Sequence, residues 1–181
     1  MRSARLFGWK TSHDPQASHA QGCVQHRGHF ARGLDRHYLK KGVSPFFADY
    51  ALGAFTAARA GMLIADPAEF IVVSQNDEGI DGFIRVTEGS TAPVKDCSGF
   101  EIATFYVQPR HHGKGIGSAL LNAALAHCRS RSASSVWLTT NAENAPAIAF
   151  DLDRGFVEVG KSYFTIADQN YLNNVYSHPL S

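Results

Sequence analysis

Short runs of apolar residues bounded by turn residues occur in several places along this chain. The stretches Glu69–Ser74 and Ile80–Val86 are typical of two strands, and the turn residues Asn76–Gly79 between them predict a hairpin. A third strand is predicted at Glu101–Val107, where β-branched and aromatic residues run up to Pro109. This part of the chain is therefore expected to be rich in strands.

Helical periodicity occurs in three other places. Apolar residues fall on one stripe over residues 45–65, which glycines divide into two short helices. A helix is predicted from Ile116 to about Arg131, because apolar residues recur there at steps of three and four. A shorter helix is predicted to open at Asn144 and to end at Gly155. A further strand is predicted at Val136–Thr140. The tail alternates well enough for two antiparallel strands around residues 168–170: the first covers Phe156–Val159 and Ser162–Ala167, and the second covers Tyr171–His178.

The N-terminal segment, residues 1–44, has little periodicity and is rich in His, Arg, Gly and Ser. It holds five of the nine histidines, but their irregular spacing lacks the paired ligands typical of a metal site, and no metal is expected. The 181 residues are interpreted as one domain over residues 45–181, preceded by this variable segment.

Composition narrows the classes of function. Hydrophobic residues make up 44% and charged residues 18%, which is typical of a globular protein. The net charge of +1 disfavours a nucleic-acid binder, which normally needs a basic face. No apolar run reaches the length of a membrane span, and the three widely spaced cysteines favour reduced thiols. A cytoplasmic protein is expected, without a nucleic-acid or membrane partner.

A strand-to-helix connection with three glycines is the most informative local feature. Gly113 and Gly115 lie between the strand that ends before Pro109 and the helix that begins at Ile116, and Gly117 follows in the first turn of that helix. Glycines let an anion approach the backbone, and the first N–H groups of a helix lack internal partners. Nearby side chains add positive charge: Arg110, His111, His112 and Lys114. The spacing fits neither a Walker A loop nor a dinucleotide fingerprint, but it predicts a phosphate-binding turn.

A second motif follows about thirty residues later, and the pair resembles the two motifs of the GNAT superfamily of acyl-CoA-dependent N-acetyltransferases. The similarity spans roughly residues 67–180. The glycine motif, Gln/Arg-x-x-Gly-x-Gly/Ala, matches His112, Gly115 and Gly117. The second motif, Asn-x-x-Ala-x-x-Phe-Tyr-x-x-x-Gly-Phe, matches Asn144, Ala147, Phe150, Gly155 and Phe156. Two positions depart from the pattern, since His112 replaces Gln or Arg and Asp151 replaces the tyrosine.

The resemblance implies an α+β fold, with a mixed, mostly antiparallel sheet of about six or seven strands flanked by helices. It also implies that the central strand bulges and splays from the strand at 136–140. The gap would admit the pantetheine arm of acetyl-CoA, the acyl donor. The residues implied to hold this ligand are Tyr106, Val107, His112, Gly113, Lys114, Gly115, Ile116, Gly117, Ser118, Asn144, Ala147 and Phe150.

The implied reaction is direct attack of a neutral amine on the acetyl thioester. A backbone N–H, best supplied by Val107, would stabilise the oxyanion, and a carboxylate would accept the proton of the amine. Glu101 is the first candidate for this base and Glu88 the second, although Glu101 also fits a surface charge at a strand edge. The leaving thiolate needs less acid assistance than an alkoxide. Its proton is expected from Asp151, if burial raises the pKa of that residue, or from water or a tyrosine such as Tyr163 or Tyr171.

Two interpretations of function follow from the sequence. The first is an N-acetyltransferase acting on a primary amine of a small molecule or a peptide. The second is a catalytically silent CoA-binding or regulatory protein, which the departures at His112 and Asp151 suggest. The resemblance is also compatible with a homodimer, and the acceptor is expected to contact the helices at 45–65 and the polar loop at 88–99.

Overall fold

The computed structural model describes residues 56–95, 97–166 and 169–180. Residues 1–44, in which the resemblance places a first strand, and residues 45–55 of the predicted helical region lie outside these residues. The helices are α3 (Ala57–Ala65), α4 (Ile116–Ser130) and α5 (Ala145–Asp153), with a 3-10 turn η1 (Pro109–His111). The strands are β1 (Glu69–Asn76), β2 (Gly79–Glu88), β3 (Phe100–Val107), β4 (Ser135–Asn141), β5 (Val157–Ile166) and β6 (Gln169–Pro179).

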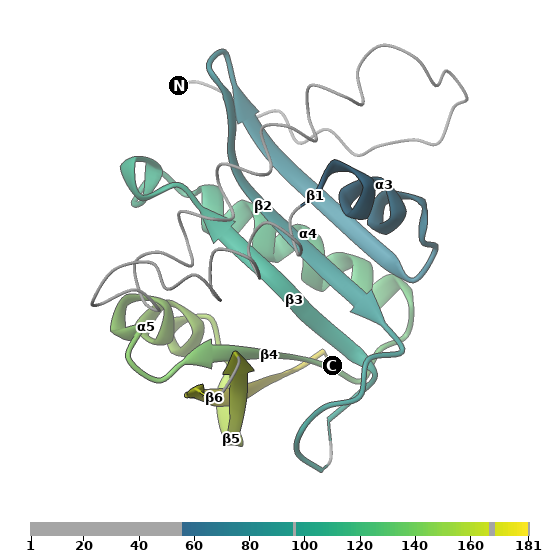
Figure 1. The fold of residues 1–181 in the computed structure, drawn as a ribbon, viewed down its shortest axis with the longest axis vertical. Coiled ribbons are helices and arrows are strands. Elements are labelled where there is room, and N and C mark those ends of the chain that lie inside the picture. The colour runs from purple at the N-terminus through teal and green to yellow at the C-terminus, as the bar shows by residue number, and fades with distance from the viewer. Residues whose placement is uncertain (1–55, 96, 167–168, 181) are drawn as a thin grey trace.

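The strands form one mixed sheet of six in the order β1-β2-β3-β4-β6-β5 (Figure 1). Every neighbouring pair is antiparallel except β3 and β4, which run parallel. The hairpin, the central strand and the two tail strands therefore lie where the sequence predicts them. The α+β class and the mostly antiparallel, helix-flanked sheet are confirmed.

The turn between β1 and β2 shows how local chemistry sets the register. The side chain of Asn76 accepts a hydrogen bond from the backbone N–H of Glu78 at 2.7 Å. Gly79 then adopts a φ of 126°, which a residue with a side chain rarely does. Together they reverse the chain, so that Val72 pairs with Ile84 and the apolar residues of both strands share a face.

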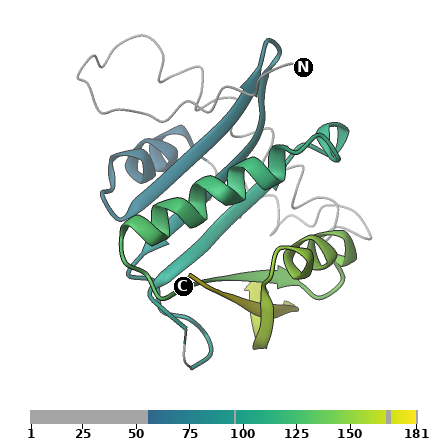
Figure 2. The ribbon, with the colours of Figure 1, turned by 180° about the vertical axis from the view of Figure 1, so that it is seen from behind.

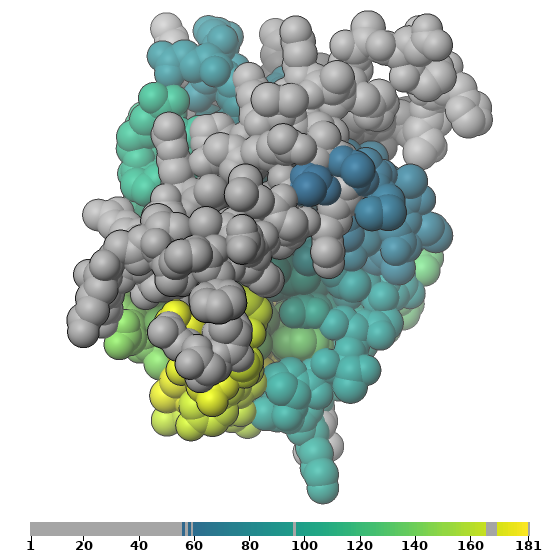
Figure 3. Space-filling view, in the orientation of Figure 1, coloured from purple at the N-terminus to yellow at the C-terminus, as the bar shows by residue number. Residues whose placement is uncertain are grey.

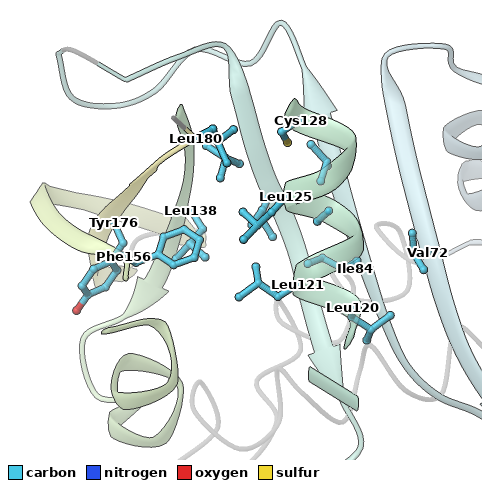
Figure 4. Packing of buried hydrophobic residues seen from close by; sticks show 14 residues of the cluster. Val72, Ile84, Leu120, Leu121, Leu125, Cys128, Leu138, Phe156, Tyr176 and Leu180 are labelled. Carbon is cyan, nitrogen blue, oxygen red and sulfur yellow. The ribbon is translucent and has the colours of Figure 1, made fainter. Parts of the chain in front are cut away.

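Helix α4 supplies the centre of the core by packing across β1, β2 and β3 (Figure 2). Its buried residues follow the predicted stripe: Leu120, Leu121, Ala124, Leu125 and Cys128. They contact Ile84 of β2 and, from the other part of the sheet, Leu138 and Phe156 (Figure 4). Burial raises the pKa of the Cys128 thiol to about 11, so this cysteine is a core residue without thiolate character.

The loop between β2 and β3 is irregular, as predicted, and it extends from the lower end of the molecule (Figure 3). The backbone N–H of Ser90 donates to the carbonyl of Gly99 at 3.0 Å, which closes the base of the loop. The hydroxyl of Ser98 donates to the carbonyl of Ser135, which ties the loop to β4. Within the described residues, no helix is both long and apolar enough to span a membrane.

Candidate active site

The sheet opens between β3 and β4. Their parallel pairing consists of a single partner pair, Glu101 and Trp137, near the start of both strands. On their other sides both strands remain paired, β3 with β2 over Phe100–Val107 and β4 with β6 over Ser135–Asn141. The two strands therefore diverge toward their carboxyl ends, as the sequence predicts.

A β-bulge accompanies the divergence. Arg85 of β2 pairs with Thr104, but the next residue, Val86, pairs with Ile102, which leaves Ala103 as an extra residue in β3. Bulges of this kind bend the strand that carries them. The predicted bulge of the central strand is therefore confirmed, and it lies on the wall of the gap.

The gap forms a cleft of about 210 Å³ between the two strands and helix α5. Part of its lining is apolar, which suits a flexible chain, and part is polar, which can orient it. The lining residues are Ile102, Ala103, Thr104, Phe105, Leu138, Thr139, Thr140, Asn141, Asn144, Ala147 and Asp151.

The hydrogen-bond pattern of β3 identifies the backbone groups that face the gap. The N–H of Gln108 donates to the carbonyl of Asp81 at 2.8 Å, so these two residues form a hydrogen-bonded pair. Because such pairs alternate along an antiparallel ladder, Tyr106 directs its backbone groups to β2. Phe105 and Val107 direct theirs toward β4. Of the two residues expected to hold the ligand arm by their backbone, Val107 therefore directs its backbone groups toward the gap and Tyr106 directs them to β2, while Phe105 has the same orientation as Val107.

The glycine turn connects the wide end of the gap to helix α4. Gly113 and Gly115 have φ values of 73° and 80°, and a Cβ at either position would meet no atom of the described residues within 4 Å. Gly115 is the N-cap of α4, and no side chain caps this end of the helix. Its first turn holds no acidic residue. The positive end of the helix dipole therefore faces open space at the turn, which suits an anionic ligand.

The basic side chains of the turn contact one another and the end of β3. The Nε2–H of His112 donates a hydrogen bond to the Val107 carbonyl at 3.0 Å, so this ring links the turn to the end of β3. Arg110 and Lys114 both approach His111, at 3.0 Å and 3.4 Å. The histidine at the departure from the motif therefore contacts the strand that lines the gap.

Asp151 lies inside the cleft wall and is only 4% exposed. Its Oδ2 accepts a hydrogen bond from the Thr140 hydroxyl at 2.8 Å. Burial raises the pKa of Asp151 to about 6, and the Thr140 hydrogen bond partly opposes this rise. The carboxyl group therefore exchanges its proton close to neutral pH. Thr140 was not identified from the sequence, because only the packing of α5 against β4 brings it to Asp151.

The Thr140→Val variant should raise the pKa of Asp151 further. Valine keeps the branched shape but removes the hydroxyl that donates to the carboxylate. Titration of the carboxyl carbon by NMR measures this change directly. Thr139→Val, at the exposed neighbouring position, is the matched control and should leave the Asp151 titration unchanged. A lower pKa in Thr140→Val would contradict the role given to the hydrogen bond.

Comparison with known proteins gives the family. The family model described as the acetyltransferase (GNAT) family matches residues 36–156. The chain belongs to this family. An uncharacterised N-acetyltransferase of Methanocaldococcus jannaschii is 29% identical over 127 residues, which cover 70% of this chain and 51% of that protein. The streptothricin acetyltransferase of Streptomyces lavendulae is 33% identical over 96 residues, covering 53% of this chain and 48% of that protein.

A solved structure supports the same fold for this GNAT chain. The PaiA N-acetyltransferase of Thermoplasma acidophilum, solved in complex with coenzyme A, aligns with a TM-score of 0.70 at 13% identity. The alignment covers 98% of this chain and 99% of that one. By contrast, the chain spans about half the length of the curated relatives that it matches.

The second GNAT motif forms the opposite wall of the site. Asn144 is the N-cap of α5, and its side chain accepts the backbone N–H of Ala147 at 3.3 Å. Both residues also line the cleft, so the capping position leaves Asn144 beside the space that a ligand would fill. Phe150 packs edge-on against Phe105, with ring centroids 5.6 Å apart, and lies close to Gly117. The motif therefore joins α5 to both β3 and the glycine turn.

The other predicted catalytic side chains lie in different surroundings. Glu101 is at the closed end of the gap, where its carboxylate accepts a hydrogen bond from the Ser90 hydroxyl. Glu88 forms an ion pair with Arg131 at 2.9 Å, at the far end of α4. Tyr163 is 69% exposed on the edge strand β5 and is not among the residues that line the cleft. The structure thus brings Asp151 to the cleft and leaves Tyr163 away from it.

One cation near the turn was missed by sequence reasoning. The Arg154 guanidinium donates to the Ser118 hydroxyl at 2.8 Å, in the first turn of α4. Arg154 follows α5 as its C-cap, 36 residues from Ser118. Nothing in the local sequence relates the two, because their contact depends on how α5 packs against α4.

Proposed function

We propose that this protein transfers an acetyl group from acetyl-CoA to a primary amine by direct attack. The observation that carries the proposal is the cleft between β3 and β4, which leads to the uncapped N-terminus of α4. Membership of the GNAT family supports this reading of the cleft. The relative from Thermoplasma acidophilum, which is solved with coenzyme A, supports a CoA-linked substrate.

The residues present fit such a ligand. Gly113 and Gly115 leave space that a Cβ would otherwise occupy, and the first N–H groups of α4 suit a pyrophosphate. The proposed phosphate-binding residues are His112, Gly113, Lys114, Gly115, Ile116, Gly117 and Ser118. The backbone groups of Phe105 and Val107 suit the amides of a pantetheine arm, with Asn144, Ala147 and Phe150 on the other side.

Acetyl-CoA would supply a thioester whose carbonyl carbon is attacked by the amine. In the proposed step the C–N bond forms, the C–S bond breaks, and a backbone N–H of β3 stabilises the oxygen that gains charge. Val107 is the proposed donor, and Phe105 has the same orientation. The proton of the amine passes to a carboxylate, for which Glu101 is proposed. Because Glu101 lies six residues from Val107 along β3, about 20 Å, a chain of water molecules would have to carry the proton to it.

Asp151 is proposed to give a proton to the departing thiolate. Its pKa of about 6 is well above that of an ordinary aspartate, so part of the population is protonated near neutral pH. Transfer from such an acid to a thiolate, with a reference pKa of about 8.5, is favourable. The neutral form also avoids the repulsion that an ionised carboxylate would exert on the developing negative charge. Water is the alternative source of this proton, since Tyr163 lies away from the cleft.

The acceptor is proposed to be an amine of a small molecule, with a peptide amine as the alternative. The streptothricin acetyltransferase relative supports the small-molecule class. A panel of amines, monitored by release of the CoA thiol, separates the two. A catalytically silent CoA-binding protein is the other candidate function, because the tyrosine position of the motif holds Asp151. Acetyl transfer above the solvent rate to any amine would exclude it.

The first test is thermal unfolding with acetyl-CoA, CoA and ATP. A ligand at about 100 times its dissociation constant stabilises the folded state by about 2.7 kcal/mol, which for this size raises the melting temperature by about 5 to 11 °C. We expect this shift with acetyl-CoA and CoA but not with ATP. An unchanged melting temperature at saturating acetyl-CoA would overturn both candidate functions.

A further inference from the structure

Arg154 lies between the two helices that border the proposed ligand site. It is the C-cap of α5, and Gly155, with a φ of 84°, ends the helix directly after it. Its guanidinium reaches the neighbouring helix, where Nη2 donates to the Ser118 hydroxyl at 2.8 Å. The proposed reaction assigns no role to this arginine.

Besides the Ser118 hydrogen bond, a contact with an aromatic ring holds the guanidinium in position. Its central carbon lies 5.2 Å from the centroid of the Phe150 ring, a cation–π arrangement. Phe150 is itself fixed by its edge-on contact with Phe105 and by the proximity of Gly117. The arginine is therefore directed by the same packing that forms the wall of the cleft.

The charge of Arg154 is only weakly balanced by the chain. Among the described residues it forms an ion pair with Asp153, whose carboxylate is 3.8 Å from Nε and 74% exposed, so this pair contributes little. The first turn of α4 contains no acidic residue, and a positive group beside a helix N-terminus faces the positive end of the dipole. A negatively charged ligand between the arginine and the helix would balance both the charge of Arg154 and the positive end of the helix dipole.

The remaining cations of the turn are engaged elsewhere. Arg110 contacts Glu78 at 3.4 Å and also His111, while Lys114 approaches the other nitrogen of His111. Arg154, by contrast, donates a hydrogen bond to a side chain in the first turn of α4, that of Ser118. It is thus placed to meet phosphate oxygens that approach Ser118.

We propose that Arg154, together with Ser118, binds the pyrophosphate of the acyl-CoA donor and makes the enzyme select phosphate-bearing thioesters over truncated ones. The planar guanidinium is suited to phosphate oxygens because it presents several donors in a fixed geometry. The inference rests on the proposed function and adds a residue of α5 to the phosphate site.

The test compares Arg154→Gln with the wild-type protein on three donors: acetyl-CoA, acetyl-dephospho-CoA and S-acetylpantetheine. Acetyl-dephospho-CoA lacks only the 3′-phosphate, and S-acetylpantetheine lacks all phosphates. Loss of a hydrogen bond to a charged group predicts a KM about tenfold higher for both phosphate-bearing donors. The KM for S-acetylpantetheine should be unchanged, and Arg154→Lys should recover part of the loss.

Arg129→Gln is the matched control, since Arg129 is exposed near the far end of α4 and its loss changes the net charge equally. This variant should behave as the wild type with every donor. An equal rise in KM for S-acetylpantetheine would overturn the proposal in favour of a structural role. A loss confined to acetyl-CoA would overturn the pyrophosphate assignment, because the 3′-phosphate would then be the contact. Wild-type protein that fails to bind acetyl-CoA would instead overturn the proposed function itself.

Discussion

Near pH 8, the Asp151→Asn variant should be more resistant to urea unfolding than the wild type by about 2 to 3 kcal/mol. Burial raises the pKa of Asp151 from 3.8 to about 6, so ionising this residue is less favourable in the folded protein than in the unfolded chain. Wild-type stability therefore falls as the pH rises from about 4 to about 6, and this loss persists above that range. Asparagine carries no charge and still accepts the Thr140 hydrogen bond.

The same comparison near pH 4 should give a difference well below about 1 kcal/mol, because Asp151 is then protonated in the folded state and half-protonated in the unfolded one. Asp153→Asn is the matched control: its carboxylate is on the same helix but 74% exposed, so the variant should show no such gain. An equal stabilisation of Asp151→Asn at both pH values would refute the raised pKa.

The gain in stability should be accompanied by a loss of turnover. If Asp151 protonates the leaving thiolate, Asp151→Asn removes the proton donor and should lower kcat by roughly tenfold or more. The measurement is thiol release with a saturating amine and acetyl-CoA. Full turnover in this variant would assign the proton to water and leave Asp151 without a role in the chemical step.

The second large effect is expected at Gly115. Gly115→Ala should raise the dissociation constant for acetyl-CoA roughly tenfold or more, as measured by calorimetry. Alanine in the left-handed region is strained by about 1 to 2 kcal/mol, and relaxation of the turn would misalign the first N–H groups of α4. A steric clash with the described part of the chain is not the cause, since a Cβ there meets none of its atoms within 4 Å.

Gly89 provides the control because its backbone matches that of Gly115. It has a φ of 83°, and a Cβ there also meets nothing within 4 Å, but it lies in the loop after β2. Gly89→Ala should therefore lose similar stability while binding acetyl-CoA as the wild type does. Equal weakening of binding in both variants would mean that strain, and not the position in the turn, determines the effect.

Much of the fold could be predicted because its determinants are local. The apolar runs at Glu69–Ser74 and Ile80–Val86, with turn residues between them, specify a hairpin without further information. The apolar stripe after Ile116 identifies both the helix α4 and the face that it buries. The position of the glycine turn followed from the same local patterns.

The parts of the site that were missed depend on register and packing. Choosing between Phe105 and Tyr106 requires knowing which pairs of the β2–β3 ladder are hydrogen-bonded, and the sequence of one strand does not contain that. The contacts of Arg154 with Ser118, and of Thr140 with Asp151, join residues brought together by α5. Tyr163 alternates correctly within its strand, but the strand order places β5 at the edge of the sheet.

The single pairing of β3 with β4 has a consequence for aggregation. Unpaired strand edges on a protein surface invite pairing with other chains. Here the two unpaired edges face each other across an interior cleft that closes at Glu101 and Trp137. A foreign strand would have to enter lengthwise from the wide end, whereas a thin flexible molecule can do so easily. The fold can thus keep main-chain donors and acceptors available for a ligand without exposing a strand edge that would pair with other protein molecules.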